Sequence, residues 1–177
     1  PAVREMLDIA ERSGCTLVIS HHKAMGRRNW GRVHDTLALI DRARLGGMDA
    51  YCDAYPYTAG NTVLRALLPP WALEGGIDSM LARLRDASQR IAMREWMLER
   101  EDWENSSLAG GWDAITVTGT RVRTDCEGHS LAALAEAGGA DPIDFLFELL
   151  LEEKGGASML MFMANDDDLR TVLQRPY

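Results

Sequence analysis

Along the N-terminal part of the chain, segments with apolar residues at helical spacing alternate with segments that have the pattern of a strand. Apolar side chains at helical spacing predict a short amphipathic helix over residues 3–10, which Gly14 ends. Residues 15–20 form a brief apolar run rich in β-branched side chains, which is typical of a buried strand. Helical spacing returns over residues 33–45, and residues 48–54 indicate a second strand. This order of strand, helix and strand predicts a βαβ unit with parallel strands.

The pattern changes in the middle of the chain and resumes near its end. Residues 77–100 are a long, charged helical stretch, residues 105–112 a turn-rich loop, and residues 114–120 a short strand. Near the end, the periods predict a helix, a strand and a further helix, over residues 141–152, 158–163 and 166–174. We therefore expect an α/β fold that is interrupted by a mainly helical insertion.

The composition of the chain limits the kinds of partner that it can bind and indicates its cellular compartment. The chain has 177 residues and a formal net charge of -8. An acidic surface repels phosphate backbones, so we expect no nucleic-acid partner. No apolar run approaches the length of a membrane span and no signal peptide is visible, so we expect no membrane attachment. The three cysteines are odd in number and widely spaced, which favours reduced thiols in a cytoplasmic protein.

Two polar segments directly follow the two predicted strands. The first is SHHK at residues 20–23. Because side chains alternate along a strand, His21 and Lys23 share a face, which suits a metal ligand beside an anion-binding ammonium. In the second segment, residues 53–62, a proline restricts Tyr55 and makes a rigid loop that presents its phenol at the strand end. Taken alone, these residues also fit structural roles, as a surface histidine and a packed aromatic corner.

Four longer segments carry a family resemblance. In chain order they read VISHHKAMGRRNWG, DAYPYTAGNTVLRALLPPWALEGG, EGHSLAALAEAGGADPIDFLFELLLEEKGG and MFMANDDDLRTVLQRPY. Together they resemble the D-aminoacylase (N-acyl-D-amino-acid deacylase) family of the amidohydrolase superfamily. The resemblance implies a TIM (β/α)8 barrel enzyme that hydrolyses the amide bond of N-acyl-D-amino acids to a D-amino acid and a carboxylate. It also implies zinc, which polarises the acyl carbonyl and activates water.

The resemblance assigns roles to four residues. His21 matches the family's zinc-binding histidine, and Lys23 matches the lysine that meets the substrate carboxylate. Tyr55 matches a tyrosine close to the substrate. Asn61 stands where members of the family often have serine, and a hydrogen-bonding role towards substrate is expected there.

The departures from the family pattern bear on activity. The family's HxH pair, bridging cysteine and earlier strand-end histidine would lie before Pro1, and its catalytic aspartate in an SDG segment would follow Tyr177. We therefore expect a partial barrel, with about three of eight units. The barrel units are expected at residues 1–70 and 128–177, with the helical insertion at residues 71–127. No residue of the chain is assigned as catalytic, and the isolated chain is expected to be inactive.

Two other readings stay open. A non-catalytic barrel fragment would act through partner binding or self-association, because exposed strand edges and apolar faces favour association. Its partner would be a second copy or the missing barrel half. The other reading is a different amidohydrolase, such as a hydantoinase-like enzyme. His34 and His129 are expected to be surface or structural residues, and the acidic run at residues 166–168 is expected to cap a helix.

Overall fold

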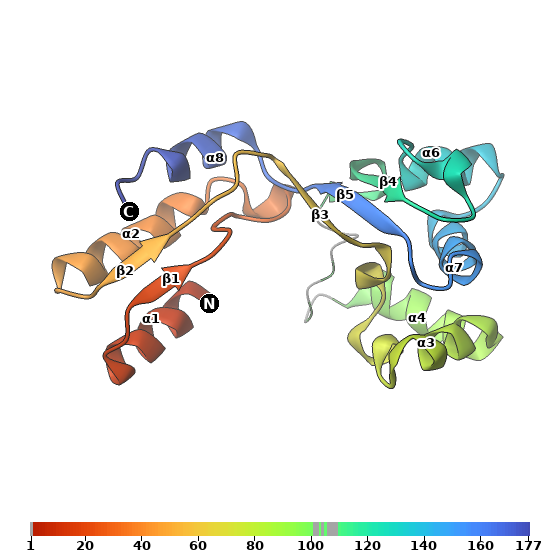
Figure 1. Cartoon of the computed structure of the whole chain (residues 1–177), viewed down its shortest axis with the longest axis horizontal. Coiled ribbons are helices and arrows are strands. Elements are labelled where there is room, and N and C mark those ends of the chain that lie inside the picture. Colours follow the sequence, from red (N-terminus) through yellow and green to blue (C-terminus); the bar gives the residue numbers. More distant parts are fainter. Residues whose placement is uncertain (1, 101–102, 104, 106–109) are drawn as a thin grey trace. The chain divides into compact units, whose positions relative to one another are not determined.

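The chain forms two compact units. The computed structural model describes residues 2–100, 103, 105 and 110–177. Unit 1 comprises residues 1–58 and 164–177, and unit 2 comprises residues 59–163. In Figure 1, unit 1 is red and orange with its returning C-terminal segment in dark blue. This division differs from the boundaries at residues 70 and 127 that the sequence patterns suggested.

Unit 1 contains the βαβ arrangement that the hydrophobic periods predict (Figure 1). Its elements are α1 (Ala2–Ser13), β1 (Leu17–Ile19), a 3-10 turn (Arg27–Asn29), α2 (Val33–Leu45), β2 (Ala50–Cys52) and α8 (Asp166–Leu173). β1 and β2 run parallel, with Leu17 paired to Ala50 and Ile19 to Cys52. The predicted parallel pair is confirmed, and both strands therefore end at the same edge.

One face of the β1–β2 pair is covered and the other is open. Leu17 and Ala50 are 5% and 0% exposed, whereas their neighbours Val18 and Tyr51 are 55% and 39% exposed. Side chains alternate between the faces of a strand, so only one face contributes to the core. The buried cluster on that face draws on α1, α2 and α8 and contains Leu7, Ala10, Leu17, Ala24, Val33, Leu37, Ile40, Ala50 and Val172. This packing holds β1 and β2 in place against the three helices.

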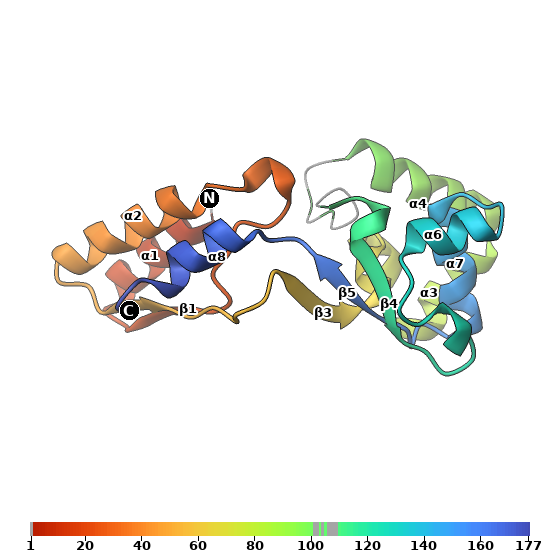
Figure 2. The same cartoon turned by 90° about the horizontal axis from the view of Figure 1, so that it is seen from above.

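Unit 2 is built on a small antiparallel sheet (Figure 2). The elements among its described residues are β3 (Ala59–Val63), α3 (Gly76–Arg85), α4 (Ala87–Glu99), β4 (Ile115–Gly119), α6 (Leu131–Ala137), α7 (Pro142–Glu152) and β5 (Ser158–Phe162), with 3-10 turns at Leu64–Leu67, Pro70–Leu73, Trp112–Ala114 and Thr124–Cys126. The strand order is β3-β5-β4. The strand expected at residues 158–163 is present as β5, but the parallel pairing expected for it is wrong. Both of its neighbours run antiparallel to it. Among the described residues, neither sheet closes into a barrel.

Local capping explains most of the remaining differences from the predicted elements. The helical stretch at residues 77–100 is two helices, because the Asp86 side chain accepts hydrogen bonds from the backbone N–H groups of Ser88 and Gln89 and starts α4 there. α6, which the periods did not reveal, begins at the N-cap Ser130. α7 begins at its predicted cap, Asp141. Half of the loop predicted at residues 105–112, namely residues 106–109, lies outside the described residues. No helix in the described part of the chain is both long and apolar enough to cross a bilayer.

Glu153 is a buried carboxylate that organises a loop of unit 2. Its side chain is 5% exposed. It accepts hydrogen bonds from the backbone N–H groups of Arg121, Val122 and Arg123, at 2.7, 2.8 and 2.6 Å. Burial raises the pKa of Glu153, but the three N–H donors together outweigh burial and hold the pKa below its ordinary value. The ionised carboxylate therefore stabilises this loop.

Replacing Glu153 with glutamine is expected to destabilise the chain by about 1–3 kcal/mol, because the amide NH2 group faces a backbone N–H and leaves a buried donor unsatisfied. A depressed pKa gives a stabilisation that is present above the ordinary value of 4.5 and is lost as the pH falls further. The variant should therefore lose less stability on acidification below about pH 4.5 than the parent.

Urea unfolding followed by tryptophan fluorescence measures this effect, since four of the five tryptophans lie in unit 2. The matched control is Glu152→Gln, whose side chain is 44% exposed and pairs with Arg123. It should change the free energy of unfolding by less than about 1 kcal/mol. Equal effects of the two substitutions would contradict the role of Glu153.

Candidate functional site

The polar segments after β1 and β2 meet at the carboxyl edge of the parallel pair. Two backbone hydrogen bonds continue the pairing past the strands, from Asp53 N–H to the Ile19 carbonyl at 3.1 Å and from His22 N–H to the Asp53 carbonyl at 2.8 Å. Active sites of parallel α/β folds form at this edge. The structure therefore brings the SHHK and DAYPY segments together.

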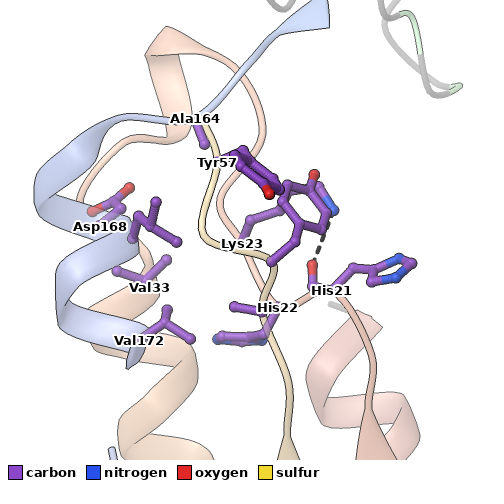
Figure 3. Close-up of a pocket in the computed structure, with 11 residues that line it drawn as sticks. His21, His22, Lys23, Val33, Tyr57, Ala164, Asp168 and Val172 are labelled. Atoms are coloured by element: carbon purple, nitrogen blue, oxygen red, sulfur yellow. Dashed lines mark hydrogen bonds between the residues drawn. The ribbon is translucent and has the colours of Figure 1, made fainter. Parts of the chain in front are cut away.

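His21, Lys23 and Tyr55 form one cluster at this edge. The imidazole of His21 and the ring of Tyr55 make an edge contact, with centroids 5.4 Å apart. Lys23 Nζ lies 5.0 Å from the Tyr55 ring centroid and donates a hydrogen bond to the His21 carbonyl at 2.9 Å (Figure 3). Tyr57 stacks on Tyr55 with centroids 6.5 Å apart. The convergence of His21, Lys23 and Tyr55 that the sequence predicts is confirmed.

The reason for this convergence differs from the one inferred from strand alternation. β1 ends at Ile19, and the chain turns at Ser20 and His21. His21 has a φ of 56°, a left-handed conformation that is uncommon for residues other than glycine. This conformation costs on the order of 1–2 kcal/mol, so neighbouring groups must stabilise it. The turn leaves the imidazole exposed, and Figure 3 shows it extending away from the His22 ring.

Asp53 supplies much of that stabilisation, and the sequence analysis did not identify it. Its carboxylate accepts hydrogen bonds from His21 N–H and from the Ser20 hydroxyl, both at 2.7 Å. The His21 N–H, and then the Ser20 hydroxyl, hold the pKa of the Asp53 carboxyl below its ordinary value. Its position at the end of a strand, next to the YPY motif, was the available signal.

A cavity lies behind the cluster, within unit 1 (Figure 3). Its empty volume, including space open to solvent, is about 300 Å³. The lining residues are His21, His22, Lys23, Val33, Ala54, Tyr55, Tyr57, Ala164, Asp168, Leu169 and Val172. Its lining surface is almost wholly apolar, with Val33, Leu169 and Val172 among the lining residues. The predicted substrate-contacting groups thus border a recess rather than a flat surface.

His22 is a structural histidine of this cavity wall. It is 6% exposed, and its Nε2 lies 3.0 Å from the Thr36 hydroxyl. Burial lowers the pKa of His22, and the nearby Lys23 ammonium lowers it further. His22 is therefore neutral at pH 7 and packs on the side away from His21.

The acidic run at residues 166–168 does not provide the helix cap. The cap of α8 is Asn165, whose side chain accepts from Asp168 N–H at 2.8 Å. Asp168 is 4% exposed, and its two carboxylate oxygens accept from Gly31 N–H at 3.0 and 2.9 Å. Asp168 is thus a buried carboxylate that binds the backbone of the loop before α2. Helix periodicity does not reveal this contact.

The fourth predicted residue belongs to unit 2. Asn61 is exposed in β3 of unit 2, where it pairs with Leu160. His34 and His129 are exposed, as expected. All three cysteines are free.

Within the part of the chain that the structure describes, no three His, Cys, Asp or Glu residues come together as a metal site. The imidazole of His21 is exposed, and an exposed imidazole is a group that can bind a metal ion.

Solved structures define the class of protein to which this fold corresponds. A crystal structure of N-acyl-D-glutamate deacylase from Bordetella bronchiseptica, in complex with zinc and a phosphonate inhibitor, matches 99% of the chain with a TM-score of 0.65 and 28% identity. A D-aminoacylase variant in complex with copper chloride matches 97% with a TM-score of 0.59 and 26% identity. The α/β fold is thereby that of D-aminoacylase-type amidohydrolases, which are hydrolases.

Sequence comparison gives a more particular relative. The chain is 30% identical over 173 residues to N-acyl-D-glutamate deacylase of Alcaligenes xylosoxydans xylosoxydans. The aligned segment covers 98% of this chain and 26% of the relative. No family model matches the sequence. The chain is homologous to the N-acyl-D-amino-acid deacylases, as its motifs indicated, and it spans about a quarter of the length of the relatives that it matches.

Proposed function

We propose that this chain contributes the substrate-facing part of a zinc-dependent N-acyl-D-amino-acid deacylase active site. The reaction is hydrolysis of the amide bond to a D-amino acid and a carboxylate. The observation that carries the proposal is the convergence of His21, Lys23 and Tyr55 at the carboxyl edge of two parallel strands. The metals named for related structures, zinc and copper, support a metal cofactor.

His21 is proposed as one metal ligand. Its imidazole is exposed at the strand edge, and its backbone is held on both sides, by Asp53 at the N–H and by Lys23 at the carbonyl. A ligand that is held before the metal arrives loses less conformational freedom on binding. Zinc bound there would polarise the acyl carbonyl and activate a water molecule.

Lys23 and Tyr55 are proposed to bind substrate. An ammonium has three donors, and Lys23 uses one of them on the His21 carbonyl, which leaves two for a carboxylate. The Tyr55 phenol supplies a further donor beside it. Asn61 is proposed as an additional hydrogen-bonding residue from β3, on the strength of the sequence motif.

We further propose that unit 1 is a segment of a (β/α)8 barrel and that unit 2 is an insertion in it. β1 and β2 would be neighbouring barrel strands, and the insertion would span residues 59–163 between β2 and α8. Ala164 N–H donates to the Thr58 carbonyl at 3.0 Å, so the chain leaves and re-enters unit 1 at adjacent points. The open face with Val18 and Tyr51 would be covered by further barrel strands or by a second copy.

The test uses the full-length protein that carries this chain. We expect it to hydrolyse N-acetyl-D-amino acids in preference to their L-enantiomers, and to lose activity on dialysis against a zinc chelator and regain it with added zinc. Hydrolysis is followed by the release of the free amine. Absence of hydrolysis of these substrates, or full activity after removal of the metal, would exclude the proposed function.

Replacing Lys23 with alanine is expected to raise KM about 10- to 100-fold with little change in kcat, because a charge-assisted hydrogen bond to the substrate carboxylate contributes equally to ground-state and transition-state binding. Steady-state kinetics on the full-length protein measures the two constants separately.

The matched control is Lys154→Ala, which removes the chain's other lysine, in unit 2. It should leave both constants unchanged. A loss of kcat at constant KM in Lys23→Ala would contradict the carboxylate-binding role.

A further inference from the structure

Two carboxylate–hydroxyl pairs connect β1 and β2, one at each end. The Thr16 hydroxyl donates to Asp49 at 2.8 Å before the strands, and the Ser20 hydroxyl donates to Asp53 at 2.7 Å after them. Both pairs join residues that are 33 positions apart, the same offset as the pairing of Leu17 with Ala50. The two aspartates thus make equivalent cross-strand contacts on one strand pair.

Asp53 has a backbone contact with His21 that Asp49 does not share, whereas the Asp49 carboxylate interacts with the Tyr51 side chain. The other carboxylate oxygen of Asp53 accepts from the backbone N–H of His21 at 2.7 Å. If the chain continued as an extended strand, residue 21 would alternate onto the same face as Leu17 and Ile19, which packs against the helices. The left-handed conformation of His21 removes its imidazole from that face and exposes it.

We propose that Asp53 is a positioning residue for His21. The carboxylate accepts from His21 N–H and from the Ser20 hydroxyl, and so holds the strained backbone that directs the imidazole outwards. The inference rests on the proposed role of His21 as a metal ligand. Asp53 does not contact the metal or the substrate in this scheme and acts through the His21 backbone alone.

The experiment measures the zinc dissociation constant of the full-length protein by competition with a chelating dye. Asp53→Ala is expected to weaken zinc binding about 10- to 100-fold, the usual range when a group that orients a metal ligand is lost. Asp53→Asn should stay within a few-fold of the parent, because its amide oxygen still accepts from His21 N–H and its NH2 group can donate to Ser20 Oγ. Ser20→Ala, which removes one of the two donors, should give an intermediate loss.

The matched control is Asp49→Ala, which removes the equivalent pair at the far end of the same strands. It should lower thermal stability to a similar extent as Asp53→Ala without weakening zinc binding. A crystal structure of Asp53→Ala should show His21 outside the left-handed region. Equal zinc loss in Asp49→Ala, or unchanged zinc binding in both Ser20→Ala and Asp53→Ala, would overturn the inference.

A double substitution separates this inference from the proposed function. If Asp53 acts through His21, then Asp53→Ala should have no further effect on zinc binding in a His21→Ala background. An additive effect would overturn the positioning role while His21 remained a ligand. Unchanged zinc binding in His21→Ala would instead overturn the proposed function, and the inference with it.

Discussion

Replacing His21 with alanine is expected to lower kcat for N-acyl-D-amino-acid hydrolysis by about 10³-fold or more in the full-length protein. Metal-assisted polarisation of a carbonyl is worth several kcal/mol in the transition state, and each 1.4 kcal/mol or so is a factor of ten in rate. The position of His21 at the carboxyl edge, with its backbone held by Asp53 and Lys23, is the structural reason to assign this effect to it. Steady-state kinetics measures the loss of kcat, and metal analysis of the purified variant measures the loss of zinc.

The matched control is His34→Ala, in which an exposed histidine of α2 is removed from the same unit. It should leave kcat and the zinc content unchanged. A His21→Ala protein that keeps its zinc and most of its turnover would contradict the assignment. Loss of zinc with retained turnover would show that the metal at His21 is not the one used in the reaction.

The 177-residue chain by itself is expected to bind zinc weakly and to give no measurable hydrolysis of N-acetyl-D-amino acids with zinc added. Catalytic zinc usually takes three protein ligands, and we propose one in this chain. Lys23 can still attract a substrate carboxylate, but ground-state binding alone does not accelerate the chemical step. The measurements are zinc content after dialysis and amine release above the buffer rate.

The full-length protein, assayed in parallel, is the control for substrate and metal quality. Stoichiometric zinc in the isolated chain, lost in His21→Ala but kept in His34→Ala, would show that the chain completes a metal site alone. Turnover well above the buffer rate that disappears in His21→Ala would likewise contradict the expectation. Either result would require further ligands from residues outside those we assign.

The βαβ segment and the edge at which the site forms are the parts that the sequence predicts well. The bounds of α2 agree with the predicted helix at both ends, because a helical stripe beginning at Val33 and the glycine pair after Leu45 are local signals. Both strands are short and apolar, and each is followed by its polar segment. Parallel pairing then brings the two polar segments to the same edge, where His21, Lys23 and Tyr55 converge.

Contacts between distant residues account for what the sequence did not predict. The apolar period of residues 158–162 reveals a strand but not its partners, and β3 and β4 pair with it in the antiparallel direction. β3 itself has a weak strand signal, since it contains a glycine and an asparagine and its last three residues are exposed. In the sequence, Asp168 has the position of a helix-capping residue. In the structure, its carboxylate accepts hydrogen bonds from Gly31, 137 positions away.

The sequence by itself determined the class of fold, the order of elements in unit 1 and the relationship to N-acyl-D-amino-acid deacylases, because periodicity and motif order are properties of the chain alone. The tertiary structure decided how His21 is presented. Alternation along a strand predicts one orientation, whereas a left-handed turn held by Asp53 produces another. That turn costs free energy locally and is stabilised by the carboxylate of Asp53, which directly follows the neighbouring strand and lies 32 positions away in the sequence, so no local pattern contains it.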